Sequence, residues 1–309
     1  MNWEDRGSEI VLFTPETFRY NVNLDYLARS AKEVMYQIDQ GCIFTLIPLA
    51  GQASEVPPLV EISGEEEGVL RVRFLGDDAS EQKAEMRAAV ARYVREWFDL
   101  DADLSAFYEL ARQDALLSKV IDRFSGLRIM GIPNLFEALC WGIIGQQINL
   151  TFAYTLKRRL VEMFGRSVEW NGRTFWTFPK PEDIAELALG DLTALQLTGK
   201  KSEYLLGVAR LMAEGGLTKA QLVEAGDLKA AEKRLVSIRG IGPWTANYVL
   251  MRCLRMPAAF PIEDVGLHNA IKHLLGLEKK PTLEDIRRLS LGWTNLEAYA
   301  TFYLWRSLY

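Results

Sequence analysis

The chain has 309 residues, 49% of them apolar and 25% charged, with a net charge of −5 and an isoelectric point near 5.4. This length and balance are typical of a globular protein with enough chain for a substantial core and two domains. The opening residues carry mixed charge, and no apolar run approaches the roughly 18 to 20 residues that span a bilayer. We therefore expect no secretory signal, no membrane role and a cytoplasmic location.

The first hundred residues favour a small sheet with two helices. Short β-rich runs occupy residues 10–13, 42–48, 59–62 and 69–75, and the last of them alternates apolar and polar side chains. Helical stretches are predicted at residues 23–38 and 80–98, the second opened by a capping box at 78–81. This part of the sequence predicts an α+β unit with an antiparallel sheet.

Beyond residue 104 the sequence has helical periodicity almost everywhere. The expected helices cover residues 104–114, 115–123, 134–164, 183–189, 201–214, 228–237, 245–254, 265–275, 283–289 and 296–308. Asn171-Gly172 predicts a single β-hairpin among them. The fold class is thus mainly α with an N-terminal α+β domain, and we place the domains at residues 1–104 and 105–309.

Three cysteines, Cys42, Cys140 and Cys253, lie far apart in apolar surroundings. They cannot form a four-cysteine zinc or iron-sulfur site, and they fit buried thiols in a reducing compartment.

A tight turn interrupts the helices at Gly240-Ile-Gly242, and Pro243 follows at the first position of a new helix. Glycines can adopt positive φ and leave backbone N–H groups uncovered at the positive end of a helix. Such a turn can bind a phosphate group without a lysine. The alternative is a plain connection between two helices.

The pattern of apolar residues, glycines and Thr245 over residues 235–246 resembles the helix-hairpin-helix motif of DNA repair enzymes. Residues 260–264 resemble the loop and aspartate of the same superfamily of base-excision DNA glycosylases, with Asp264 lying 22 residues after Gly242. Gly145-Gln-Gln-Ile148 is a third match. Over the whole chain, the sequence most resembles the bacterial 3-methyladenine DNA glycosylases.

The resemblance implies the helix-hairpin-helix glycosylase fold, with the hairpin at about 228–254 and the catalytic loop at 260–264. It implies a monofunctional enzyme that flips alkylated purines (3-methyladenine, 7-methylguanine) out of duplex DNA and hydrolyses their N-glycosidic bond, the first step of base excision repair. Two alternatives stay open: a non-catalytic helix-hairpin-helix protein that binds damaged DNA, and a glycosylase for a neutral lesion such as uracil. Asp264 argues against the non-catalytic alternative, because a protein that only binds DNA would gain little affinity from a carboxylate beside phosphates.

Asp264 is the candidate catalytic residue. Cleavage of the glycosidic bond builds positive charge on the sugar, which a fixed carboxylate stabilises while it orients or deprotonates water. Asp264 can also cap the helix that begins at Val265, and the two roles are compatible. Glu263 is the rival carboxylate, with a solvated or supporting position.

Trp244 stands where the bifunctional members of the superfamily carry a Schiff-base lysine, so the resemblance implies a simple hydrolase. Its indole can also stack on a cationic base, a contact worth about 0.5 to 2 kcal/mol. Tyr248 lies one helical turn on, and by resemblance Tyr26 adds a wall from the N-terminal domain. For Trp244 and Tyr248 the alternative is core packing. The family has a pocket tryptophan near its C-terminus, with which Trp293 and Leu296 do not align.

The expected DNA contacts come from the hairpin and from one inserted side chain. Gly240, Gly242 and Thr245 are expected to hold the DNA backbone, and Gln147 to fill the gap left by the flipped base. Gln146 and Gln147 can alternatively cap a helix or form a buried hydrogen-bonded pair. The acidic net charge is compatible with DNA binding through backbone N–H groups, and cations gather locally at Lys157–Arg159, Lys200–Lys201, Arg239, Arg252, Arg255, His268 and Lys272.

The backbone carbonyls of Val236, Ile238 and Ile241 match positions that bind a monovalent cation in similar hairpins. A sodium or potassium ion is therefore expected there, although no side chain marks the site. We expect no required cofactor, a monomer, and double-stranded DNA with alkylated bases as the partner.

Overall fold

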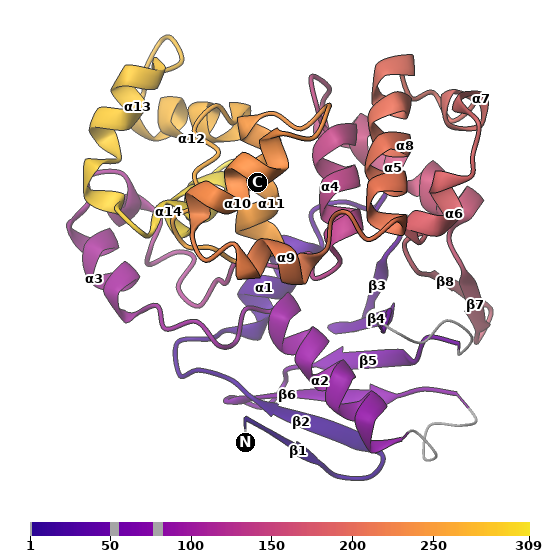
Figure 1. The fold of residues 1–309 in the computed structure, drawn as a ribbon. Helices are drawn as coiled ribbons and strands as arrows, with labels where there is room; N and C mark the ends of the chain where they lie inside the picture. The colour runs from indigo at the N-terminus through magenta and orange to yellow at the C-terminus, as the bar shows by residue number, and fades with distance from the viewer. Residues whose placement is uncertain (1, 50–55, 77–82) are drawn as a thin grey trace.

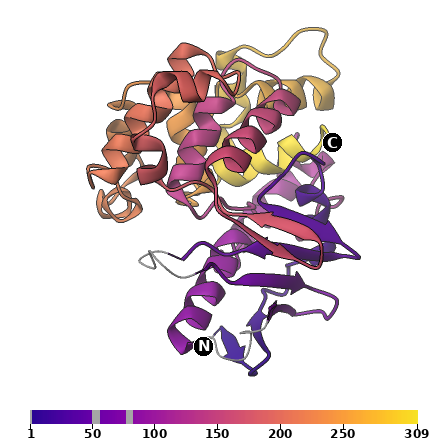
Figure 2. The ribbon, with the colours of Figure 1, turned by 90° about the vertical axis from the view of Figure 1, so that its right-hand side faces the viewer.

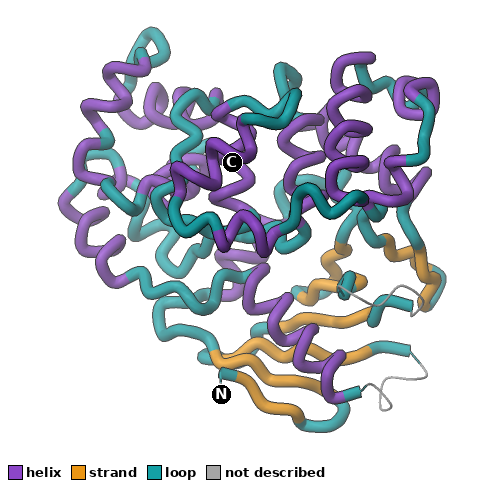
Figure 3. The backbone as a smooth tube through the Cα atoms, in the orientation of Figure 1, coloured by secondary structure: helices purple, strands orange, loops and turns teal. Residues whose placement is uncertain are grey.

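The computed structural model describes residues 2–49, 56–76 and 83–309. The N-terminal part holds an antiparallel six-stranded sheet of order β1-β2-β6-β5-β4-β3 (Figures 1 and 3). Its strands are β1 (Trp3–Asp5), β2 (Glu9–Phe13), β3 (Tyr36–Asp39), β4 (Cys42–Leu46), β5 (Leu59–Ser63) and β6 (Val69–Phe74). Two helices accompany it, α1 (Tyr20–Leu27) and α2 (Ala84–Trp97).

The buried face of the sheet follows from the alternation of its strands. Ile10 pairs with Val72, and Leu12 with Leu70, and all four side chains are fully buried. Helix α2 packs against β2 and runs across the sheet in Figure 1. Apolar side chains on one face of α2 complete this part of the core.

The helix expected at residues 23–38 is wrong in its second half. Helix α1 ends at Leu27, and the Glu33 carboxylate accepts hydrogen bonds from the N–H groups of Val34 and Met35. Residues 36–39 then form β3, joined to β4 by Gln40 and Gly41 with φ of 49° and 80°. Strand pairing and this left-handed turn prevail over local helical periodicity. The capping box expected at residues 78–81 lies outside the described residues.

The rest of the chain is almost entirely helical (Figure 3). Its α-helices are α3 (Ser105–Gln113), α4 (Leu135–Ile144), α5 (Leu150–Phe164), α6 (Pro181–Ala185), α7 (Leu189–Thr193), α8 (Gly199–Ala213), α9 (Lys219–Glu224), α10 (Leu228–Val236), α11 (Pro243–Arg252), α12 (Val265–Leu275), α13 (Leu283–Leu289) and α14 (Glu297–Arg306). Short 3₁₀ helices cover Leu117–Lys119 and Leu291–Trp293. The predicted hairpin is confirmed as β7 (Ser167–Trp170) and β8 (Arg173–Trp176).

The helix expected at residues 183–189 is interrupted, since α6 ends at Ala185 and α7 begins at Leu189. Two further expected helices differ from the structure. The long helix at 134–164 is two helices, because Gln147 takes a left-handed φ of 56° and Asn149 caps α5 by accepting from the Phe152 N–H. The helix at 115–123 is reduced to a 3₁₀ turn, where the Asp114 carboxylate accepts from two backbone N–H groups. In both places a short polar side chain captures backbone donors that a continuous helix would use.

One apolar core runs from the sheet to α14 without interruption. Figure 2 shows the helical body of the second half of the chain above the sheet, and the β7–β8 hairpin lies against β3 and β4. The domain boundary at 104/105 stays a prediction. Within the described residues, no helix combines the length and apolar character needed to cross a membrane.

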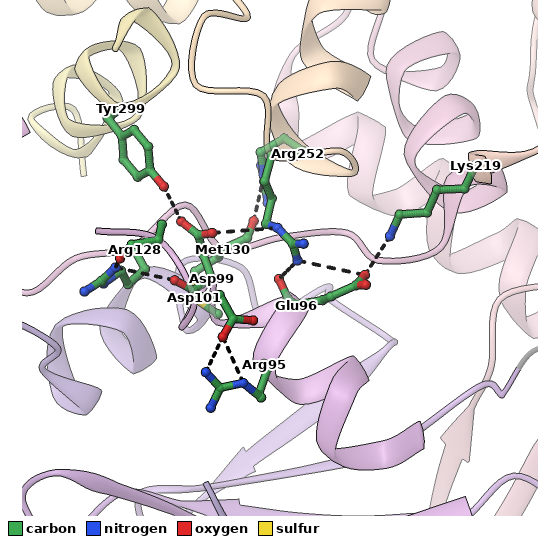
Figure 4. A network of polar contacts seen from close by, with 11 residues as sticks. Arg95, Glu96, Asp99, Asp101, Arg128, Met130, Lys219, Arg252 and Tyr299 are labelled. Carbon is green, nitrogen blue, oxygen red and sulfur yellow. Dashed lines mark hydrogen bonds and ion pairs between the residues drawn. The ribbon is translucent and has the colours of Figure 1, made fainter. Parts of the chain in front are cut away.

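A polar network fastens the end of α2 to the helical body (Figure 4). The Tyr299 hydroxyl donates to the Asp99 carboxylate at 2.5 Å, and Lys219 donates to Glu96 at 2.6 Å. Arg255 donates to the Glu96 carbonyl oxygen at 2.9 Å and lies 3.7 Å from Asp99. These contacts join α2 to α9, α14 and the segment after α11, which fixes the sheet relative to the helices that carry the candidate site.

Candidate active site

The turn between α10 and α11 depends on one of its two glycines. Gly240 has a φ of 94°, and a Cβ there would lie 2.2 Å from the Tyr204 ring. Gly242 instead has a φ of −89°, and a Cβ at that position would meet nothing within 4 Å, so it is the open N-cap of α11. Positive φ is therefore confirmed for Gly240 only. The bare Gly242 leaves the first N–H groups of α11 accessible.

Gln146 and Gln147 lie in different environments, the first bonded to the hairpin and the second exposed. The Gln146 side-chain amide donates to the Gly240 carbonyl at 3.0 Å and to the Thr245 hydroxyl at 3.1 Å, which ties the α4–α5 turn to the hairpin. Gln147 is exposed at the tip of the same turn. Thr245 is only 1% exposed, and its methyl group packs against Gly142. Its side chain is therefore not accessible, and the expected DNA contact is limited to its backbone N–H.

The residues expected to bind a cation lie together. Val236, Ile238 and Ile241 line one shallow depression over the hairpin, which Glu263 also borders. The Ile238 carbonyl accepts from the Ile241 N–H at 3.0 Å, which leaves one of its two lone pairs available. Carbonyl oxygens suit hard cations, and the sodium or potassium site stays a prediction.

The Asp264 carboxylate accepts three hydrogen bonds. The indole N–H of Trp244 donates to Oδ2 at 2.9 Å, and that of Trp305 donates to Oδ1 at 2.7 Å. The Leu267 N–H also donates to Oδ1, at 2.8 Å, so Asp264 is the N-cap of α12 as well. The side chain is half-buried, whereas Glu263 is exposed. Two indoles hold one carboxylate in a fixed orientation next to the hairpin.

Trp305 is a tryptophan of the site that the sequence patterns did not indicate. It comes from α14, and Gly266 makes room for it, since a Cβ at that position would lie 2.8 Å from Asp264 and 3.2 Å from the Trp305 ring. Trp293 is fully buried and donates to Asp114 at 2.9 Å. The C-terminal tryptophan that contacts Asp264 is thus Trp305 and not Trp293.

An aromatic cluster extends inward from Asp264 along α11. Trp244 is half-buried and stacks on Tyr248 with ring centroids 5.7 Å apart, and Tyr248 is 6.3 Å from Trp305. Burial raises the pKa of Tyr248, so its phenol stays neutral. Tyr26 reaches the same cluster, where the Arg252 guanidinium lies 5.8 Å from its ring and 5.5 Å from that of Tyr248. Tyr26 and Tyr248 are 2% and 5% exposed, so both are less accessible than the half-buried Trp244.

Comparison with known proteins identifies the family. Residues 140–295 match the HhH-GPD superfamily of base excision DNA repair proteins, and residues 9–139 match the N-terminal domain of 8-oxoguanine DNA glycosylase. The chain belongs to the HhH-GPD superfamily. The expected superfamily and fold class are thereby confirmed.

Relatives of this superfamily member carry glycosylase names. The chain is 50% identical to the DNA-3-methyladenine glycosylase of Bacillus subtilis (strain 168) over 309 residues, 100% of both chains. It is 40% identical over 192 residues to the putative DNA-3-methyladenine glycosylase YfjP of the same organism, covering 62% of this chain and 65% of that one. The solved 3-methyladenine DNA glycosylase of Archaeoglobus fulgidus shares the fold with a TM-score of 0.79 at 24% identity, over 96% and 97% of the two chains.

Several cations of this HhH-GPD protein are not available to phosphates. Lys157 is buried between Glu33 and Glu137, at 3.0 and 2.9 Å. Lys201 is buried and donates to the Ile144 carbonyl at the end of α4, and Arg252 is 5% exposed. Three of the cations seen in the sequence are therefore internal, whereas Lys200 is exposed. Arg239 remains exposed beside the hairpin.

Asn247 connects the hairpin to the expected catalytic loop at residues 260–264. Its amide N–H donates to Glu232 on α10 at 2.7 Å and to the Pro243 carbonyl at 3.0 Å. Its carbonyl oxygen accepts from the Phe260 N–H at 2.9 Å. One buried side chain thus links both helices of the hairpin to the segment that ends in Asp264, a link that sequence spacing could not predict.

Proposed function

We propose that this protein is a DNA glycosylase that hydrolyses the N-glycosidic bond of alkylated purines, 3-methyladenine and 7-methylguanine among them, in duplex DNA. The observation that carries the proposal is the Asp264 carboxylate, held by the indoles of Trp244 and Trp305 beside the helix-hairpin-helix turn. The names of the relatives that match the chain support the same substrate class.

Binding begins at the hairpin. The open N-terminus of α11 at Gly242 offers backbone N–H groups to a phosphate of one strand. A sodium or potassium ion held by the carbonyls of Val236, Ile238 and Ile241 would add positive charge between the turn and that phosphate. No further cofactor enters the proposal, and the protein acts as a monomer. Gln147, exposed on a left-handed turn, enters the duplex and fills the gap left by the flipped base.

The chemical step needs a carboxylate near the sugar. As the bond from C1′ to the base nitrogen breaks, its electron pair leaves with the base and positive charge develops on the sugar. Asp264 stabilises that charge and accepts a hydrogen bond from the water that attacks C1′. The two indole donors keep the carboxylate oriented without moving during the reaction. The products are a free base and an abasic site.

The site favours hydrolysis over a covalent route. Trp244 occupies the position after the hairpin where an amine nucleophile would be needed. Among the described residues, no lysine borders the depression over the hairpin. Lys157 lies deeper in the protein, where burial lowers its pKa but Glu137 and Glu33 raise it overall, so it stays protonated. A protonated amine is no nucleophile.

Trp244 supports selectivity for cationic bases. Its half-buried indole can stack on a base with a formal positive charge, and a cation–π contact distinguishes charge rather than hydrogen-bond pattern. Trp244→Ala should reduce the rate for 7-methylguanine more than the rate for neutral hypoxanthine. Equal losses would mean that Trp244 contributes only packing.

The proposal is tested with methylated duplex DNA. Wild-type protein should release 3-methyladenine and 7-methylguanine and leave an intact abasic strand, and borohydride should trap no protein–DNA adduct. A trapped adduct would refute the monofunctional mechanism. Binding of the methylated duplex without base release would favour the alternative of a non-catalytic damage-binding protein.

A further inference from the structure

The hairpin turn carries an exposed cation. Arg239 directly precedes Gly240, and its side chain is 81% exposed. It borders the depression over the hairpin together with Ile241 and the open N-cap Gly242. Among the described residues that line this depression, Arg239 is the one cation and Glu263 the one carboxylate. A guanidinium therefore lies beside the backbone N–H groups that the proposed function offers to a phosphate.

A carboxylate from another helix already engages this cation. The Glu203 side chain on α8 accepts a hydrogen bond from Arg239 Nη2 at 2.8 Å. The Glu203 side chain is itself 45% exposed, so both partners of the ion pair face solvent. An exposed pair contributes little stability, because water screens the attraction and holding two long side chains together costs entropy. The pair can therefore open without a large loss of stability.

The turn and α8 pack closely, which keeps the two charges together. A Cβ on Gly240 would lie 2.2 Å from the Tyr204 ring, so this ring lies directly against the backbone of the turn. Tyr204 also lines the depression, and the Arg239 guanidinium lies 6.0 Å from its ring. Glu203 is the residue before Tyr204, and its bond to Arg239 places its carboxylate next to the depression.

A DNA phosphate at the turn would compete with Glu203 for the same guanidinium. Arginine binds the oxygens of a phosphate through parallel N–H donors, as it binds a carboxylate. The phosphate would also meet the positive N-terminal end of α11. In the part of the chain that the structure describes, Arg239 is the one group that donates to the Glu203 carboxylate. Exchange of the carboxylate for a phosphate therefore breaks a single exposed contact.

We propose that Glu203 is an internal competitor of DNA: it holds Arg239 in the free protein, and Arg239 exchanges it for a phosphate when a duplex binds the hairpin. The inference rests on the duplex binding of the proposed function and adds a side-chain contact to the backbone contacts expected there. Glu203 thereby lowers the affinity for any duplex, damaged or not, because a phosphate carries no information about the base. The pair reduces the occupancy of undamaged DNA and leaves the chemistry at Asp264 unchanged.

The test measures the affinity for an undamaged duplex and its dependence on salt. Fluorescence anisotropy gives the Kd for wild type, Glu203→Gln, Arg239→Gln and the double variant. Glu203→Gln should bind about three- to fivefold more tightly, because the competing charge is lost. Arg239→Gln should bind at least about threefold less tightly, and its plot of log affinity against log salt should be shallower by about one unit of slope.

The double variant separates competition from simple charge repulsion. Without the guanidinium, Glu203 has nothing to hold, so adding Glu203→Gln to Arg239→Gln should change the Kd by less than about twofold. Glu162→Gln is the matched control. Glu162 lies on α5 in an ion pair with Arg158, with side chains 47% and 40% exposed, and the substitution changes the net charge equally. It should leave the Kd within about twofold of wild type.

Single-turnover excision of 7-methylguanine separates this role from catalysis. In Glu203→Gln the rate constant at saturating protein should stay within about twofold of wild type, while the half-saturating concentration should fall with the Kd. Unchanged or weaker duplex binding by Glu203→Gln would overturn the inference, as would an equal gain in the Arg239→Gln background or in Glu162→Gln. A wild type that binds the duplex and releases no base would refute the proposed glycosylase function, and the affinities would still decide the exchange.

Discussion

Trp305 donates its indole N–H to Oδ1 of Asp264 at 2.7 Å, across 41 residues of sequence. Helix α14 thereby supplies one of the two indoles that fix the candidate catalytic carboxylate, and Trp244 at the start of α11 supplies the other. The orientation of Asp264 thus depends on the packing of α14 against α12, two elements that lie side by side.

Trp305→Phe should slow base release without abolishing it. The ring is largely retained while one N–H donor to the carboxylate is lost, and a hydrogen bond to a charged group contributes about 1.5 to 3 kcal/mol, or on the order of 10- to 100-fold in rate. Single-turnover excision of 7-methylguanine measures the effect. Trp170→Phe on β7 is the control, and equal rates in both variants would remove Trp305 from the site.

Gly266→Ala tests the same contact from the other side. The added Cβ would lie 2.8 Å from Asp264 Oδ1 and 3.2 Å from the Trp305 ring, so one of them must shift. We expect a loss of rate on the order of tenfold with duplex affinity retained. Gly207→Ala on α8 is the control, because a Cβ there meets nothing within 4 Å. A wild-type rate in Gly266→Ala would show that the carboxylate tolerates displacement.

Local patterns were sufficient for the parts of the site that are contiguous in sequence. The hairpin turn, the start of α11 and the capping position of Asp264 follow from glycines, a proline and an N-cap residue within short windows. Trp305 could not be found in this way, because no spacing rule relates it to a residue on another helix. Gly266 was a usable signal, since a glycine inside a helix often marks a close approach.

The other differences arise where tertiary contacts prevail over local preference. Residues 36–39 form a strand because β4 offers them a partner, although their neighbours have helical periodicity. The helix expected at 134–164 breaks at Gln147, whose left-handed backbone is not indicated by its residue type. Lys157 and Arg252 were among the cations that the sequence suggested for DNA binding, and only the structure shows that both are buried.

Asp264→Asn should abolish detectable base release while the fold and duplex affinity persist. Asparagine is as good an N-cap as aspartate, so α12 should be retained. The variant loses the negative charge that faces the positive charge developing on the sugar. In addition, the NH₂ group of the asparagine side chain faces at least one indole N–H, and two donors cannot form a hydrogen bond with each other. Release of methylated bases from duplex DNA and binding to an undamaged duplex are measured together. Wild-type turnover in this variant would exclude Asp264 as the catalytic residue.

Gly242→Asp should weaken binding to any duplex, damaged or not. The position is open, so the side chain fits, but a carboxylate then lies where a phosphate is expected. A loss of about tenfold or more in affinity at moderate salt is expected, with an unchanged melting temperature. Gly242→Ala is the neutral control. Unchanged affinity in Gly242→Asp would leave the turn with a purely structural role.

Asp99 should make the stability of the protein depend on pH. Burial raises the pKa of its carboxyl to about 6, although Tyr299, Arg255 and Arg128 oppose the rise. The ordinary value is about 3.9, so between about pH 4 and 6 the folded state binds the proton more tightly than the unfolded state. The free energy of unfolding therefore falls as pH rises through this window, by up to about 3 kcal/mol from this group alone.

Asp99→Asn should remove that contribution. The amide is neutral, still accepts the Tyr299 hydrogen bond, and tolerates the left-handed φ of 51° at this position. We expect the variant to lose less stability than wild type between about pH 4 and 7 in urea unfolding experiments. Asp101→Asn, which changes a largely exposed carboxylate paired with Arg95, is the control. If wild type and Asp99→Asn show the same pH dependence, the pKa of Asp99 is the same in the folded and unfolded states, and the network around Arg255 offsets the effect of burial.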